Sequence, residues 1–92
     1  MDAATFTADT EALADHLANA YENLGLDEIH PAMACRYRDM ATELTSDNLP
    51  RDPKAIAEVL ALSVHEVGHL DQVAPWQFAR HLDIADDVLA EF

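Results

Sequence analysis

Apolar residues recur every three or four positions along most of the chain, which is the spacing of one face of an α-helix. The first apolar stripe predicts a helix from residue 9 or 10 to residue 24, ended by Gly25 as a left-handed cap. A second helix is predicted from about residue 28 to 44, with Asp27 as its N-cap. No segment alternates in the way that a β-strand does, so the pattern predicts an all-α fold.

The most apolar stretch lies in the second half of the chain. Residues 55–64 contain a single charged residue, Glu58, and follow Asp52-Pro53, a good N-cap with proline in the first helical turn. This pattern predicts a third helix over about 53–73. A fourth is predicted over about 75–92, paired with the third as an antiparallel hairpin. We therefore expect one acidic helical domain, residues 1–92, built as a compact bundle of about four helices with the third helix central.

Charge changes this picture more than any other property of the composition. The chain has 18 acidic and 5 basic residues, a net charge of −13, and most of this charge lies toward the two ends. Such a surface repels nucleic acid and anionic membranes, and it favours basic partners, divalent cations or a high-salt medium. The single cysteine and the absence of a secretory or membrane-spanning pattern predict a cytoplasmic protein.

Two acidic helix faces are the candidate partner-binding surfaces. On the fourth helix, Asp83 and Asp87 lie four residues apart on the outer side. Trp76 lies near the start of the same helix, either as an interface anchor or folded over the end of the core. Three carboxylates share a narrow arc of the first helix, opposite its apolar stripe: Glu11, Asp15 and Glu22. The alternative for that arc is an ordinary solvated face.

Carboxylates four residues apart on a helix are separated by about 6 Å, close to the spacing of neighbouring phosphates. In size and charge, the chain is similar to small acidic helical inhibitors such as anti-CRISPR proteins and colicin immunity proteins. This similarity implies an inhibitor that occupies the basic, nucleic-acid-binding site of a protein or nucleoprotein complex, without binding nucleic acid or membrane itself. The alternative is a halophilic domain, in which the acidity is an adaptation to high salt and specifies no partner.

A different function is suggested by five residues, His65-Glu66-Val67-Gly68-His69. On a helix, two histidines four residues apart leave the same face and can bind one metal ion. The pentapeptide resembles the HExxH motif of zinc proteases. That resemblance implies a zinc-dependent metallohydrolase with His65 and His69 as zinc ligands and Glu66 as general base.

The residues around this motif depart from the zinc-protease pattern. The metzincin positions for a glycine and a third histidine hold Gln72 and Pro75, and no strand is predicted to align a substrate. A third ligand would have to come from the fourth helix: His81, Asp83, Asp87 or Glu91. The two motif histidines also fall about 180° and 220° from Ile56 on a helical wheel, as a solvated polar stripe would.

Three interpretations of the motif therefore stay open: a hydrolase, a structural or adventitious metal site, and a polar stripe. We favour a protein that is not an enzyme and has no cofactor, with zinc as the alternative. His81 falls at the edge of the apolar arc of the fourth helix, where we expect a hydrogen-bonded boundary residue rather than a ligand.

Overall fold

A computed structural model describes residues 5–92 and confirms the all-α fold. Four α-helices follow one another along the chain: α1 (Thr10–Glu22), α2 (Pro31–Ser46), α3 (Pro53–His65) and α4 (Pro75–Glu91). Two single turns of 3₁₀-helix lie in the connections, η2 (Leu26–Glu28) before α2 and η3 (Leu70–Gln72) before α4. None of the helices in this part of the chain is long and apolar enough to cross a membrane.

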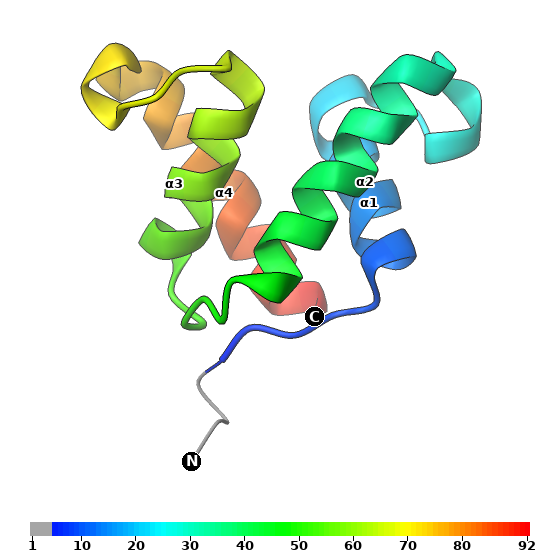
Figure 1. The fold of residues 1–92 in the computed structure, drawn as a ribbon, viewed down its shortest axis with the longest axis horizontal. Coiled ribbons are helices and arrows are strands. Elements are labelled where there is room, and N and C mark those ends of the chain that lie inside the picture. The colour runs from blue at the N-terminus through cyan, green and yellow to red at the C-terminus, as the bar shows by residue number, and fades with distance from the viewer. Residues whose placement is uncertain (1–4) are drawn as a thin grey trace.

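The four helices form two antiparallel hairpins, α1 with α2 and α3 with α4 (Figure 1). Further contacts of α2 with α3 and of α1 with α4 join the hairpins into one bundle. The segment before α1 crosses the closed end of the bundle, where the Phe6 amide donates to the Leu49 carbonyl at 2.7 Å and the Phe6 ring is fully buried. At the other end, the ribbons of the two hairpins spread apart (Figure 1).

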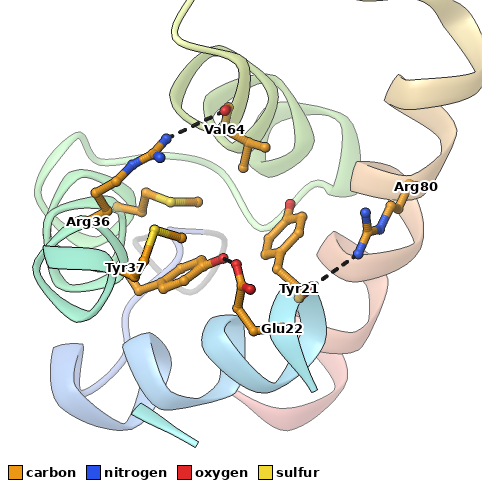
Figure 2. Close-up of a pocket in the computed structure, with 8 residues that line it drawn as sticks. Tyr21, Glu22, Arg36, Tyr37, Val64 and Arg80 are labelled. Carbon is orange, nitrogen blue, oxygen red and sulfur yellow. Dashed lines mark hydrogen bonds between the residues drawn. The ribbon is translucent and has the colours of Figure 1, made fainter. Parts of the chain in front are cut away.

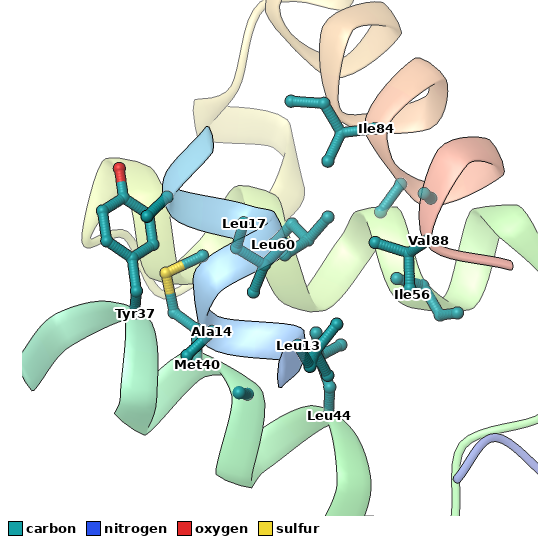
Figure 3. Close-up of a cluster of buried hydrophobic side chains, with 14 of the residues drawn as sticks. Leu13, Ala14, Leu17, Tyr37, Met40, Leu44, Ile56, Leu60, Ile84 and Val88 are labelled. Atoms are coloured by element: carbon teal, nitrogen blue, oxygen red, sulfur yellow. The ribbon is translucent and has the colours of Figure 1, made fainter. Parts of the chain in front are cut away.

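The core fills the space between the hairpins with side chains from all four helices (Figure 3). Leu60 of α3 and Val88 of α4 have no exposed surface, and neither does Leu17 of α1. Burying one such aliphatic side chain contributes roughly 1.5–3 kcal/mol to folding. The predicted apolar segment of the third helix is confirmed as core, because α3 packs on both α4 and α2 and has four residues without exposed surface: Ile56, Ala57, Leu60 and Ala61.

Helix starts follow the sequence signals more closely than helix ends. The Asp52 carboxylate accepts a hydrogen bond from the Ala55 amide at 3.2 Å, as an N-cap does. The N-cap of α2 is His30, whose ring accepts from the Ala32 amide, and not Asp27 as predicted. Asp27 lies instead in η2, because one 3₁₀ turn separates α1 from α2.

The residue that caps the C-terminal end of α1 also differs from the prediction. The helix ends at Glu22, and Asn23 takes the left-handed cap with φ 59°. Asparagine is the residue that adopts this conformation most easily after glycine. Gly25 has φ −70° and is therefore not the cap.

The predicted extent of the third helix, about 53–73, is wrong at its C-terminal end. Glu66 adopts the left-handed conformation, with φ 53° and ψ 44°, and turns the chain away from the helix axis after His65. The amides of Glu66 and Val67 both donate to the Leu62 carbonyl, which closes the last turn. The residues from Glu66 to Ala74 therefore form a connection that contains η3.

Candidate functional site

Two adjoining cavities lie where the hairpins spread apart. The first, about 230 Å³, is lined from all four helices, with Arg36 and Tyr37 of α2 facing Tyr21 of α1 and Arg80 of α4 (Figure 2). The second, about 420 Å³, is lined by residues of the α3–α4 hairpin: Val64, His65, Trp76, Gln77, Arg80 and His81. Val64 and Arg80 line both cavities. Together they form a cleft that combines aromatic, cationic and imidazole groups.

A chain of three polar side chains crosses the inner part of this cleft. The Tyr21 hydroxyl lies 2.7 Å from Nδ1 of His81, and Nε2 of His81 lies 2.9 Å from Nε2 of His65. The prediction that His81 is hydrogen-bonded is confirmed, but the residue is only 2% exposed and is therefore buried rather than at the boundary of the core. Burial, together with the nearby His65 and Arg80, lowers the pKa of His81 to about 4. Its imidazole is therefore neutral at pH 7. One ring nitrogen then donates a hydrogen bond and the other accepts one, and their partners are Tyr21 and His65.

The two tyrosine hydroxyls of the cleft are protonated and hydrogen-bonded. The rings of Tyr21 and Tyr37 stack with their centroids 6.1 Å apart, and the guanidinium of Arg80 lies 5.3 Å from the Tyr21 centroid. The Tyr37 hydroxyl donates to the Glu22 carboxylate at 2.6 Å (Figure 2). Burial raises the pKa of both hydroxyls, and for Tyr37 the bond to Glu22 raises it further. Both stay protonated at physiological pH.

Arg36 connects the two hairpins across the mouth of the cleft. Its guanidinium donates to the Ser63 carbonyl at 3.3 Å and to the Val64 carbonyl at 3.5 Å, both in the last turn of α3. Figure 2 shows the bond to Val64. These carbonyls have no partner within the helix, and a cation at a helix C-terminus also opposes the negative end of the helix dipole. Arg36 thereby fixes the end of α3, and so the position of His65.

The helix geometry that the zinc-protease interpretation requires is not formed. Because α3 ends at His65, His65 and His69 do not lie on consecutive turns of one helix. His69 is exposed at the start of η3, and the Glu66 side chain is 77% exposed, 3.9 Å from Arg36. Within residues 5–92, no three or more His, Cys, Asp or Glu side chains are grouped to hold a metal ion. His65 is not on a solvated polar stripe either, because it faces His81.

The three carboxylates predicted as the acidic face of α1 are exposed, but each is held by another part of the chain. Glu11 accepts three hydrogen bonds from Arg38, at 2.9, 3.1 and 3.2 Å, and this contact lowers the pKa of Glu11. Asp15 accepts from the Leu26 amide at 2.8 Å, and Glu22 accepts from Tyr37. Their role in partner binding stays a prediction.

The partner-binding residues predicted on α4 are exposed and, unlike the α1 carboxylates, have no hydrogen-bond or ion-pair partner among the described residues. Trp76 is 76% exposed, so it does not fold over the end of the core. Asp83 and Asp87 are exposed, and no described residue donates a hydrogen bond to either carboxylate or forms an ion pair with it. At 100° per residue, these three side chains fall within about 20° of one line along α4 and span about 16 Å.

The sequence pattern missed the tyrosines and arginines of the cleft. Tyr21 and Tyr37 were part of the apolar stripes, and helical spacing alone does not show that their hydroxyls would meet His81 and Glu22. Arg36 and Arg80 offer a clearer signal, since only five basic residues occur in the chain. No known protein family, curated protein or solved structure matches this chain significantly.

Proposed function

We propose that this domain binds a basic surface of a partner protein through the outer face of α4, as an inhibitor of a nucleic-acid-binding site would. The observation that carries the proposal is the line of Trp76, Asp83 and Asp87, exposed and without internal partners on a chain of net charge −13. The partner is a basic protein or the basic face of a nucleoprotein complex, and we expect the two to meet in the cytoplasm. The proposal involves no enzymatic step.

The distribution of internal ion pairs supports α4 as the contact surface. Among the described residues, two ion pairs form, Arg38 with Glu11 and Arg36 with Glu66. Carboxylates that already have a partner must lose it before they contact another protein, and this cost reduces the gain from binding. The carboxylates of α4 carry no such cost.

Arg80 lies on the same helix and could neutralise this surface, but its contacts turn it toward α1. Its guanidinium donates to the Tyr21 carbonyl at 3.4 Å and lies over the Tyr21 ring. Arg80 therefore forms no ion pair with Asp83 or Asp87. Such charges chiefly raise the rate of encounter with a basic partner, and their effect falls with salt.

Trp76 supplies what the carboxylates cannot, a large apolar contact at one end of the charged line. Tryptophan is enriched among the few interface residues whose truncation costs about 2 kcal/mol or more of binding free energy. A second protein would cover this ring together with the opening of the 420 Å³ cavity that it lines. The predicted contact is therefore an aromatic anchor with carboxylates one to three helical turns away.

The test compares two variants of equal net charge. One carries Asp83→Asn with Asp87→Asn on α4; the control carries Asp39→Asn with Asp47→Asn, two exposed carboxylates on and just after α2. Each variant and the wild type is immobilised and exposed to a heparin-retained fraction of nucleic-acid-binding proteins at low salt. We expect the wild type and the control to retain a protein that the α4 variant loses, and a nucleic-acid fragment to displace that protein.

Two results would overturn the proposal. One is that folded wild type retains nothing at low salt, and the other is that the two double variants retain the same protein equally. Unfolding is followed in parallel from low to molar salt. A domain that folds only in molar salt would assign the acidity to salt adaptation and remove the reason to expect a basic partner.

A further inference from the structure

We propose that His65 and His81 form a binding site for a divalent transition-metal ion, with Cu(II) and Ni(II) as the preferred ions. Imidazole nitrogens are good ligands for both ions. The site differs from the pair implied by the HExxH resemblance, because it uses one histidine from the end of α3 and one from α4. The observations behind it do not depend on the partner-binding proposal.

The two nitrogens are close enough to bind one ion after a rotation of one ring. Nε2 of His65 and Nε2 of His81 lie 2.9 Å apart, which is the separation of a hydrogen bond. With metal–nitrogen bonds of 2.0–2.1 Å, two ligands of one ion lie about 2.9–3.3 Å apart. Affinity for nitrogen ligands rises along the divalent first-row ions through Ni(II) to Cu(II), which makes these two the preferred ions.

His81 has the surroundings of a metal ligand as well as the position. Metal-bound histidines almost always form a hydrogen bond through their second ring nitrogen, which fixes the ring and its tautomer. In His81 that nitrogen is Nδ1, 2.7 Å from the Tyr21 hydroxyl. When Nδ1–H donates to Tyr21, Nε2 of His81 carries a lone pair, which accepts from His65 without an ion and would bind the ion once His65 turns away. The buried ring of His81 is therefore oriented before any ion arrives.

His65 supplies the adjustable half of the site. Its ring is only partly buried, and it lines the 420 Å³ cavity together with His81. Without an ion, the two rings meet at 79° with their centroids 5.0 Å apart, and one proton lies between the two Nε2 atoms. Metal binding moves that proton: His65 changes to its Nδ1–H tautomer and its ring turns toward the cavity. Both imidazoles stay neutral, so no net proton is released.

The cavity leaves room for the remaining ligands. It opens in front of both histidines, and its other lining residues, Val64, Trp76, Gln77 and Arg80, include no carboxylate or thiol. Water or a small ligand would complete the coordination. Because His65 ends α3 and His81 belongs to α4, a bound ion would join these two helices at the open end of the bundle.

The test titrates Cu(II), and separately Ni(II), into chelator-treated full-length protein, with calorimetry for affinity and electron paramagnetic resonance for the Cu(II) ligands. We expect one ion per chain and hyperfine splitting from two imidazole nitrogens. His65→Gln should lower the affinity by more than about 100-fold, because it removes a ligand. Tyr21→Phe, which keeps both ligands, should lower it by about 10–100-fold. His69→Gln is the matched control and should bind as the wild type does.

Three results would overturn the proposal. The first is that wild type shows no stoichiometric ion at the histidines, which leaves the pair as a hydrogen bond only. The second is that His65→Gln binds as tightly as the wild type, which assigns the ion to the acidic surface. The third is that His69→Gln loses binding as His65→Gln does, which assigns the ion to the HExxH pair. None of these variants removes the buried His81 ring, and Tyr21→Phe tests its orientation with both ligands in place.

Discussion

The buried imidazole of His81 should make the free energy of unfolding depend on pH, and the substitution His81→Gln should remove this dependence. In the folded state its pKa is lowered to about 4, because the ring is buried beside His65 and Arg80. In the unfolded chain a histidine titrates near 6.5. His81→Gln keeps a side chain that can form hydrogen bonds but does not titrate, so it isolates this contribution.

The sign follows from which state takes up the proton. Above pH 6.5 the imidazole is neutral in both states and stability does not depend on its titration. Between pH 6.5 and 4 the unfolded state binds a proton that the folded state does not, so the free energy of unfolding falls as the pH falls. The full loss is about 3 kcal/mol, of which roughly 2.5 kcal/mol is reached by pH 4.5. In a domain of this size that corresponds to a melting temperature lower by roughly 10–20 °C.

The assay is urea unfolding of wild type, His81→Gln and the exposed control His69→Gln at pH 7.5 and pH 4.5, with a chelator present. The carboxylates titrate in all three proteins, so the difference between their pH slopes reports the histidine alone. We expect His69→Gln to follow the wild type, and His81→Gln to lose roughly 2.5 kcal/mol less on acidification. Parallel curves for wild type and His81→Gln, or an NMR titration that puts the His81 pKa near 6.5, would refute the reasoning.

Two further substitutions test the packing and the end of α3, both by urea unfolding at pH 7.5. Leu60→Ala should cost about 2–5 kcal/mol, because Leu60 has no exposed surface and its removal leaves a cavity between the hairpins; a cost under 1 kcal/mol would contradict its place in the core. Glu66→Gly should stabilise the domain by up to about 1 kcal/mol, because glycine adopts the left-handed cap without strain and the exposed contact with Arg36 adds little. A loss of stability in this variant would show that the contact with Arg36 outweighs the backbone strain.

α4 carries both proposed activities on different sides. Its outer line presents Trp76 and two aspartates to solvent, and its inner side presents His81 to α3 and α1. Trp76 belongs to both regions, because it is exposed and also lines the cavity in front of the histidines. A partner that covers Trp76 would therefore also cover the entrance to the proposed metal site, and its binding should then respond to Cu(II).

Much of the candidate site could not be predicted, because it depends on which helices meet. The helical wheel placed Asp83 and Asp87 on the outer side of α4, where the structure has them exposed. It also placed Glu11, Asp15 and Glu22 on an exposed arc, but it could not show that Arg38, the η2 backbone and Tyr37 would hold them. Those contacts join residues 11–27 positions apart, and helical periodicity contains no information on such pairs.

The sequence by itself determined the fold class, the starts of α3 and α4 and the apolar segment of α3. These features depend on local signals, namely apolar spacing, an aspartate cap at Asp52 and a proline in the first turn. The end of α3 and the pairing of His65 with His81 were decided only by the tertiary structure. Apolar spacing continues through Val67 and Leu70, and a left-handed glutamate at position 66 has no sequence signal. The meeting of two histidines 16 residues apart requires the α3–α4 hairpin to close and the helix to stop where it does.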